Sequence, residues 1–321
     1  MPRATIADVA RRAKVSKTAV SFAFNDPSQL SADTVERIKA AAVELGYAPH
    51  PVARTMTTKR TGVIGILLPQ PVHVVLANPF YPLLLQGIGG VCDEQAYSLM
   101  LVSPVCGSVE AALSRAAVDG YISIGMDESQ VPIALILRRE MPIVLLDSGQ
   151  ACGAAPHINV DDLAGARDVA RHLLELGHTE ILVLGIHSGD PRSPLRGIPR
   201  VRLVGYRRAF EDAGVLWSEE NVRLVASTRR AGREAALEAL GKKRYTAVLA
   251  QSDILALGAY DAAAALGMSV PSDLSVAGFD GLRMAELLCP QLTTVQQPAR
   301  EKAAHAAKLL LQALHGRRAE S

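Results

Sequence analysis

Two rhythms of apolar and polar positions divide this chain. Over the first 46 residues, apolar side chains recur at intervals of three and four, the spacing of helices with one buried face. From Gly62 onward, short and nearly continuous apolar runs alternate with longer amphipathic stretches. Buried strands that alternate with helices are typical of parallel sheets covered on both faces. The pattern therefore predicts an α/β fold that follows a small helical N-terminal unit.

The N-terminal unit is expected to contain three short helices. Thr5, with Asp8 three residues later, marks the first helix start, and Ser16 and Ser31 mark the other two, because their side chains can satisfy free backbone amides. The short link over residues 13–16 forces the sharp crossing of a helix-turn-helix unit. The apolar stripes indicate one shared core, made of Ile6, Val9, Ala10, Ala13, Val20, Ala23, Phe24, Val35, Ile38, Ala42 and Leu45.

The second of these helices has a polar side opposite its core residues. Lysine can donate to guanine O6 and N7, threonine can hydrogen-bond or touch a thymine methyl group, and phenylalanine offers an apolar contact. A helix reads base edges in the major groove of DNA through such contacts. The sequence therefore predicts a short reading surface, formed by Lys17, Thr18, Ser21 and Phe22.

The distribution of charge supports a polyanionic partner for this end of the chain. Of 34 basic and 32 acidic residues, residues 1–60 hold 10 and 5, which leaves 24 and 27 for the remainder. The head thus carries about +5 and the body about −3. Because neutralising phosphates releases condensed counterions, a polyanion such as double-stranded DNA suits the head as a partner. The alternative is that the basic side chains of this segment only face solvent and bind no partner.

Residues 47–61 contain two prolines and little core-forming material, and this composition predicts a linker. Pro51 can start a short helix with Val52, Ala53 and Met56 on one face. A lone helix of this length is marginal in water. We therefore expect it to order only against a partner, such as its twin in a dimer that lies on DNA.

The remaining 260 or so residues exceed what one sheet usually takes, so we expect two similar α/β lobes with a break near residues 157–161. In open α/β sheets the ligand lies beyond the carboxyl ends of the strands, which places a small-molecule site in the cleft between the lobes. The expected strands are residues 62–68, 98–103, 120–124, 143–147, 181–186, 247–251 and 275–279.

Several other classes lack their signatures. The N-terminus has no apolar run like that of a secretory signal, and no stretch approaches about 18 uninterrupted apolar residues, so we expect a cytoplasmic protein. The four cysteines lack C-x-x-C spacing, the histidines are scattered, and no hydrolase, nucleotide-binding or metalloprotease motif is found. We expect no metal, no cofactor and no catalysis. The competing classes are an enzyme built on α/β lobes and an exported solute-binding protein.

Six segments, in order along nearly the entire chain, carry a family resemblance: TIADVARRAKVSKTAVSFAFN, ELGYAPHPVARTM, INVDDLAGARDVARHLLELGH, RLVGYRRAF, SDILALGAYDAAAALGMSVPSDLSVAGFD and PQLTTVQQP. With these segments the sequence resembles the lactose-repressor (LacI/GalR) family of bacterial regulators. The resemblance implies a helix-turn-helix headpiece over residues 1–48, a hinge over 49–60, and a two-lobed periplasmic-binding-protein-like effector domain over 61–321. The first lobe would comprise residues 61–158 and 291–321, and the second 159–290.

The resemblance also implies how the protein would bind DNA. It implies a homodimer in which each second helix reads a half-site of a near-palindromic operator, while paired hinge helices enter the central minor groove. Met56 matches the position of a leucine that wedges between base pairs, and Ala53 lies beside it. The alternative for Met56 is a residue of a flexible linker. The implied DNA-binding residues are Thr5, Ser16, Lys17, Thr18, Ser21, Phe22, Asn25, Ala53 and Met56.

The effector, a sugar or sugar derivative on this reading, would contact residues from both lobes. The residues implied by the resemblance are Phe80 and Tyr81 in the loop over 78–81, Arg200 and Arg202, Asp253, and Asp280. Asp253 could instead cap a helix, because an acid at a helix N-terminus is favoured by the helix dipole. Asp280 could likewise cap a loop.

The sequence departs from the family pattern in three places. Lys14 stands where glycine is frequent, so a left-handed backbone conformation is expected at a non-glycine residue, at a cost of roughly 1 kcal/mol. Ser227 replaces an aromatic residue that commonly stacks on a sugar. The chain ends before the strands that relatives add to the second lobe, so we expect either an exposed sheet edge or an incomplete chain.

One loop is rich in arginine and suggests a second kind of effector. Guanidinium groups there could pair with a phosphate or carboxylate of an anionic ligand. The alternative is that most of them are solvated loop residues. The arginines concerned are Arg192, Arg196, Arg200 and Arg202.

Overall fold

The computed structural model describes residues 4–48, 55, 60–126, 130–149, 155–187 and 195–319, with side chains described as far as residue 316. The chain divides into two units, one formed by Met1–Gly62 with Ala117–Asp119 and the other by the remainder. Within the described ranges, no helix combines the length and apolar character needed to cross a bilayer.

The first unit contains three helices around one small core, as predicted. They are α1 (Ile6–Ala13), α2 (Lys17–Asn25) and α3 (Ala32–Glu44), with a 3-10 turn, η1 (Pro27–Gln29), between the last two. The core includes Val9, Val20 and Ile38, all fully buried. The apolar faces of the three helices therefore pack against one another, as the sequence predicted. Ile6, Phe24 and Leu45 are only partly buried, at the margin of this core.

The turn between α1 and α2 confirms the conformation expected at Lys14, which has φ +52° and ψ +49°. This left-handed residue lets the chain reverse sharply, and its backbone amide caps the end of α1. Ser16 then starts α2, since its Oγ accepts a hydrogen bond from the Ala19 amide at 3.0 Å. Ser31 occupies the equivalent position before α3, but its hydroxyl pairs with that of Thr34 instead of a backbone amide.

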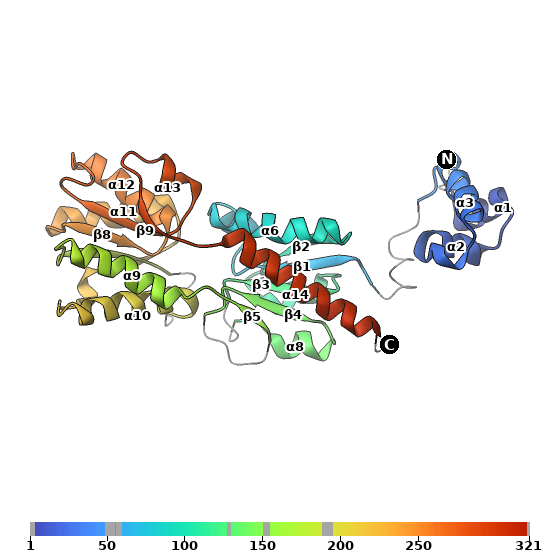
Figure 1. Cartoon of the computed structure of the whole chain (residues 1–321), viewed down its shortest axis with the longest axis horizontal. Coiled ribbons are helices and arrows are strands. Elements are labelled where there is room, and N and C mark those ends of the chain that lie inside the picture. Colours follow the sequence, from blue (N-terminus) through green and yellow to red (C-terminus); the bar gives the residue numbers. More distant parts are fainter. Residues whose placement is uncertain are drawn as a thin grey trace. The chain divides into compact units, whose positions relative to one another are not determined.

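The second unit contains two parallel five-stranded sheets, as expected for two α/β lobes (Figure 1). In the first lobe the strand order is β2-β1-β3-β4-β5. The strands are β1 (Val63–Leu67), β2 (Ser98–Val102), β3 (Gly120–Ile124), β4 (Ile143–Leu146) and β5 (His157–Ile158). The helices are α5 (Val72–Val75), α6 (Phe80–Glu94), α7 (Val109–Arg115), α8 (Ile133–Arg138) and the C-terminal α14 (Ala299–Ala319).

The second lobe has the corresponding order β10-β9-β8-β6-β7. Its strands are β6 (Ile181–Ile186), β7 (Val222–Val225), β8 (Ala247–Ala250), β9 (Ser275–Asp280) and β10 (Thr293–Gln296). Its helical segments are α9 (Asp162–Glu175), α10 (Gly197–Asp212), η2 (Glu219–Asn221), α11 (Arg229–Lys242), α12 (Asp253–Ala265) and α13 (Arg283–Leu287).

Three short strands were not predicted: β5, β7 and β10. Each lies at the edge of its sheet and lacks the continuous apolar run by which the other strands were found. Because β10 pairs with β9 of the second sheet, the chain returns to the first lobe after Gln296 and not at residue 291, where the sequence reading placed the return.

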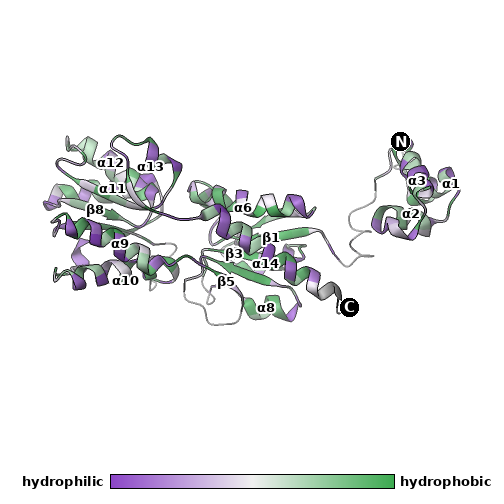
Figure 2. Ribbon diagram, in the orientation of Figure 1, coloured by the Kyte–Doolittle hydropathy of each residue, from purple (hydrophilic) through white to green (hydrophobic). Residues whose placement is uncertain are grey.

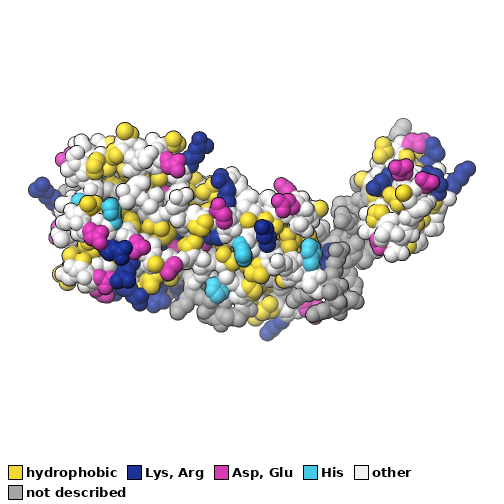
Figure 3. Space-filling model, viewed as in Figure 1, with side chains coloured by type: hydrophobic (Ala, Val, Ile, Leu, Met, Phe, Trp, Pro, Cys, Tyr) yellow, Lys and Arg dark blue, Asp and Glu magenta, His cyan; other side chains and the backbone are white. Residues whose placement is uncertain are grey.

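Helices cover the sheets as the apolar runs require. Figure 2 shows that a central strand such as β1 is hydrophobic along its length, whereas the helices have mixed faces. In the first lobe α6 and α14 lie side by side on β1, β3 and β4. Their close approach needs Gly87, because a Cβ there would collide with the Arg300 carbonyl oxygen. Figure 3 shows basic and acidic side chains intermixed over α9 and α10, where Arg167 pairs with Asp212 and Arg171 with Asp168.

Candidate functional sites

The first candidate site is the exposed side of α2. Lys17, Thr18, Phe22 and Asn25 are all exposed, and Ser21 between them is half-buried. The opposite side of the helix is anchored in the headpiece core by Val20 and Ala23. Phe22 is 39% exposed although it is a large apolar residue, which suits a surface that contacts a partner.

Two hydroxyls at helix starts differ in what they can offer to DNA. The Ser16 Oγ accepts from a backbone amide, so its own hydrogen remains available for a phosphate oxygen. The Thr5 Oγ1 instead donates to Asp8 Oδ2 at 2.7 Å, and the Thr5 amide donates to the same oxygen at 3.0 Å. These bonds hold the pKa of Asp8 below its usual value. Thr5 can therefore donate to a phosphate only after the Asp8 bond opens.

The positive charge of the head is unevenly distributed. Arg12 pairs with Glu44 at 2.7 Å and Arg11 with Asp8 at 3.3 Å. Among the described residues, Lys14 and Lys17 have no carboxylate within ion-pair distance. Part of the remaining excess lies toward the linker, in Arg54 and in two residues near its end, Lys59 and Arg60. Ala53 and Met56, implied as hinge contacts, lie outside the described residues.

The second candidate site is a cavity of about 490 Å³ between the two sheets of the body. Much of its lining comes from the carboxyl ends of strands and from the first two turns of helices, near where parallel α/β sheets place their ligands. The residues of strand ends are Ile124, Gly125, Asp147, Ile186, His187, Ala226, Ser227, Ser252 and Asp280. Those of the first two helical turns include Phe80, Tyr81, Pro199 and Arg202.

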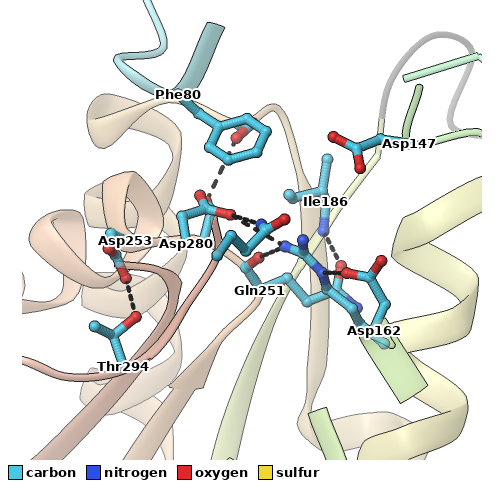
Figure 4. Close-up of polar contacts among 12 residues, drawn as sticks. Phe80, Asp147, Asp162, Ile186, Gln251, Asp253, Asp280 and Thr294 are labelled. Atoms are coloured by element: carbon cyan, nitrogen blue, oxygen red, sulfur yellow. Dashed lines mark hydrogen bonds and ion pairs between the residues drawn. The ribbon is translucent and has the colours of Figure 1, made fainter. Parts of the chain in front are cut away.

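Asp162, Gln251 and Asp280 form part of a buried polar cluster on the second lobe (Figure 4). Arg202 is also buried and has a polar contact with each of the three. Its Nε donates to Asp162 Oδ1 at 2.8 Å, and its other arm bonds the Gln251 carbonyl oxygen and lies 3.5 Å from Asp280 Oδ1. The guanidinium also stacks 3.7 Å from the centre of the Phe279 ring. Burial disfavours the charged form, but Asp280 and Asp162 outweigh it and raise the pKa of Arg202.

Asp280 ends β9 and faces the cavity. Burial raises its pKa to about 7, and the nearby Arg202 limits the rise. Its φ of +128° is a backbone conformation that favours glycine, and the other acid of the cavity, Asp147, has φ +55°. Such strain costs on the order of 1–3 kcal/mol and persists where surrounding contacts over-determine it, often at binding sites. Both cavity carboxylates are therefore held in place by their neighbours.

Asp147 follows β4 of the first lobe and is paired with a residue from α14. The Lys302 Nζ donates to Asp147 Oδ1 at 2.6 Å and to Oδ2 at 2.8 Å, and lies 4.9 Å from the centre of the Phe80 ring. It also donates to Gln297 Oε1 at 2.6 Å, while Gln297 Nε2 donates to Asp280 Oδ1 at 2.8 Å. A chain of polar contacts thus connects the acid of one lobe with that of the other.

A second contact crosses between the lobes. Asn78, which precedes α6, donates from Nδ2 to Ser227 Oγ at 3.3 Å, and Ser227 Oγ lies 3.4 Å from Ser252 Oγ. Phe80 and Tyr81 follow Asn78 and line the cavity, as the resemblance implied. Burial and the nearby acids Asp147 and Asp280 raise the pKa of Tyr81, so its hydroxyl stays protonated and can donate to a ligand.

Two residues implied as effector contacts lie elsewhere. Asp253 is fully buried, and its carboxylate accepts from the Leu282 amide at 2.7 Å and from Thr294 Oγ1 at 2.5 Å. Figure 4 shows it turned toward Thr294 and away from Asp162. It fastens α12 to β10 and the β9–α13 turn, which corrects its assignment to the ligand. Arg200 is exposed and does not line the cavity, which Arg202 reaches from the next half-turn of α10.

The arginine-rich loop gives an anionic effector little support. Arg202 is already countered by Asp162 and Asp280, and Arg200 points to solvent. Arg196 lines the cavity and is exposed. Arg192 lies outside the described residues. Within those residues no group of three or more acidic, histidine or cysteine side chains is placed to hold a metal ion.

The buried position of Asp253 has a consequence for stability. Its pKa is raised from 3.8 to about 6, chiefly by burial, although Thr294 and the Leu282 amide oppose the rise. A carboxyl group with a raised folded-state pKa stabilises the fold below its unfolded-state pKa and loses that contribution as the pH rises through the folded value. In the parent protein, ionisation of Asp253 should lower the free energy of unfolding by about 2 kcal/mol between pH 4 and pH 7. We expect the variant Asp253→Asn to lack this pH-dependent loss.

The measurement is denaturant unfolding of parent and variant at a series of pH values. Trp217, the single tryptophan, packs against Phe210 in the same lobe, with 5.2 Å between the centres of the two rings. Its fluorescence reports the unfolding transition. The difference between the two proteins cancels the titration of the other groups. A difference that does not change with pH would show that Asp253 is ionised throughout.

The sequence reading missed several residues of the cavity cluster. Asp147, Gln251 and Ser252 directly follow buried strands, and a polar residue at that position is a signal that could have found them. Lys302 stands on the buried stripe of α14, three residues after Ala299 and four before Ala306. A charged residue on an apolar stripe is also visible in the sequence, but its partner is not.

Comparisons with known proteins cover both units. Residues 5–50 match the sequence pattern of the bacterial regulatory proteins of the lacI family, and residues 170–321 match that of the periplasmic binding protein-like domain. Among curated proteins, the HTH-type transcriptional regulator Rv3575c of Mycobacterium tuberculosis is 36% identical over 331 residues, which covers 96% of this chain and 90% of that protein.

Two solved structures resemble the whole chain, each covering 98% of it and 94% of the other protein. The lac repressor dimer bound to operator and the anti-inducer ONPF is 27% identical, with a TM-score of 0.80. The complex of the transcriptional regulator CelR with cellobiose is 28% identical, with a TM-score of 0.69.

Proposed function

Because this chain belongs to the LacI family of bacterial regulatory proteins, we propose that it is a dimeric repressor whose affinity for a near-palindromic operator is controlled by a small metabolite. Its relatives are transcriptional regulators and not enzymes, and it shares their helix-turn-helix unit and ligand-binding domain. We further propose that residues 1–48 are the DNA-binding headpiece, 49–60 the hinge and 61–321 the effector domain.

One observation carries the DNA-binding proposal: α2 presents an exposed row of side chains on the side opposite its core. Lys17, Thr18 and Phe22 are exposed at its first two turns, with hydrogen-bonding and apolar groups suited to base edges. Ser21 and Asn25 continue the row, and Ser16 adds a hydroxyl for a phosphate. Thr5 remains a proposed contact, as do Ala53 and Met56, which lie outside the described residues.

The effector is proposed to be a polar metabolite such as a sugar or a sugar derivative. The cavity offers carboxylate acceptors in Asp147 and Asp280 and donors in Arg202 and the Tyr81 hydroxyl, while Phe80 adds an apolar face. Carboxylates accept hydrogen bonds from the hydroxyl groups of such ligands, and the related CelR was solved with cellobiose. The volume of about 490 Å³ lies within the range of pockets for small molecules.

Control of DNA binding would follow from contacts that both lobes make with the effector. A ligand that bridges Asp147 of the first lobe and Arg202 of the second would favour one arrangement of the lobes, and the proposed hinge, which precedes the first lobe in the sequence, would respond to it. Coupling is reciprocal, so an effector that weakens operator binding must itself bind less tightly to the DNA-bound protein.

The test is selection of DNA fragments by the purified full-length protein from a random duplex pool at moderate salt. We expect an enriched motif with two-fold symmetry, and its loss when residues 1–60 are deleted. The deleted protein should keep the folded body, which the Trp217 fluorescence transition reports. Enrichment of no sequence, with or without added cell metabolites, would contradict the proposal.

A further inference from the structure

Lys302 is the one lysine that is at least nine-tenths buried among the residues whose side chains are described. It lies on the inner stripe of α14, between Ala299 and Ala303, where every other inward position shown is alanine or leucine. A lysine in such surroundings is costly unless its charge is countered. Apolar packing therefore does not explain an ammonium group at this position. The explanation must lie in the polar contacts that the group makes.

The contacts of Lys302 are directed at one carboxylate. All three of its hydrogen bonds go to side-chain oxygens, two of them on Asp147 and the third on Gln297. Asp147 lines the cavity, whereas Lys302 lies behind it and does not. The ligand thus meets the carboxylate, while the positive charge that compensates it is supplied from the interior.

The buried charges around the cavity nearly cancel, and the exposed Arg196 adds one further base to the lining. Three buried acids, Asp147, Asp162 and Asp280, face two buried bases, Lys302 and Arg202. Because burial raises the pKa of Asp280 to about 7, one of the acids is partly protonated near neutral pH. A site with little net charge but several hydrogen-bonding groups favours an uncharged ligand over an ion.

We propose that Lys302 sets the charge selectivity of the effector cavity: by orienting and neutralising Asp147, it makes the cavity select an uncharged ligand that donates hydrogen bonds and exclude cations. This inference rests on the proposed effector role of the cavity. Lys302 acts as a positioning residue, since it reaches the ligand only through Asp147. Gln297 extends its influence to Asp280 on the other lobe.

The proposal has two opposite consequences. Removing the ammonium group leaves Asp147 as an uncompensated carboxylate on the cavity wall, which then attracts a small cation from solution. Removing the carboxylate leaves Lys302 uncompensated, and the cavity then attracts a small anion. Removing both restores neutrality. A residue that merely filled space would produce none of these charge-specific changes.

The test compares Lys302→Met, Asp147→Asn and the double variant with the parent by ligand-observed NMR titration at pH 8. The cation probe is ethanolammonium, with ethylene glycol as its uncharged counterpart. The anion probe is acetate, with acetamide as its counterpart. Lys308→Met is the matched control, because Lys308 is an exposed lysine two turns further along α14.

We expect Lys302→Met to bind ethanolammonium at least about tenfold more tightly than the parent, and Asp147→Asn to do the same for acetate. The double variant and Lys308→Met should bind both ions as weakly as the parent. If Lys302→Met does not fold, the acetate titration of Asp147→Asn decides. Equal binding of the ions by the parent, the folded single variants and the double variant would overturn the proposal.

Failure of this inference can be distinguished from failure of the proposed function. The titrations involve no DNA, so they report on cavity charge even if the protein selects no operator. Conversely, a parent protein that enriches an operator but shows no charge switch in its variants keeps its proposed function and loses the role assigned to Lys302.

Discussion

Replacing Arg202 by methionine is expected to lower the unfolding free energy of the body by about 3–5 kcal/mol, because it leaves buried charges without their partner. Arg202 lies between Asp162 and Asp280 and also bonds the carbonyl oxygen of Gln251. Methionine keeps much of the side-chain volume over the Phe279 ring but removes all of these polar contacts. The two acids then repel each other, and their pKa values rise further.

The measurement is denaturant unfolding followed by Trp217 fluorescence, with Arg200→Met as the matched control. Arg200 lies two residues earlier on α10, is exposed, and does not reach the cavity. Its replacement should change the unfolding free energy by less than about 0.5 kcal/mol. Equal losses in the two variants would show that Arg202 is not the charge that holds the cluster together. Arg202→Lys should recover only part of the loss, because an ammonium group cannot bond both acids in the same geometry.

The second large effect is expected on DNA recognition. Once an operator has been selected, the double variant Lys17→Met, Phe22→Ala should bind it about 100- to 1000-fold more weakly, since each lost base contact costs about 1–3 kcal/mol. Binding to random duplex should fall far less, because it depends mainly on phosphate contacts. The measurement is a titration of both DNAs at one fixed salt concentration.

The control for this experiment carries the same chemical changes on another helix. Lys39→Met, Val43→Ala removes one lysine charge and truncates one apolar side chain on α3, where Lys39 is exposed and Val43 is 82% exposed. We expect it to retain operator preference. If both double variants lost operator and random duplex binding in the same proportion, α2 would contribute charge but no sequence recognition.

The architecture was largely predictable because its signals are local. Helical stripes, strand-length apolar runs and capping residues specify elements through the immediate neighbours of each residue, so the three headpiece helices and seven of the strands were expected. The left-handed turn at Lys14 was expected for the same reason. The strands that were not predicted are short edge strands with partly polar sequences. They form because they pair with an adjacent strand, and their own residue pattern does not indicate a strand.

The binding cavity was only partly predictable. Phe80, Tyr81, Arg202 and Asp280 line it as the resemblance implied, but Asp253 and Arg200 do not. Both misplaced residues are close in sequence to residues that do reach the cavity, Ser252 and Arg202. A rotation of one or two residues along a helix decides whether a side chain faces a ligand, a sheet or solvent, and that rotation is set by packing.

By itself, the amino-acid sequence determined a basic helical head with a reading side on its second helix, followed by two lobes of parallel strands. These follow from periodicity and composition, which act within a few residues. Only the tertiary structure decided which acids face the cavity and which bases neutralise them. Lys302 and Asp147 are 155 positions apart, and the salt bridge between them exists because α14 returns to the first lobe after the second is complete. Such a pairing depends on the packing of segments that are distant in the sequence, and local patterns of residues do not predict it.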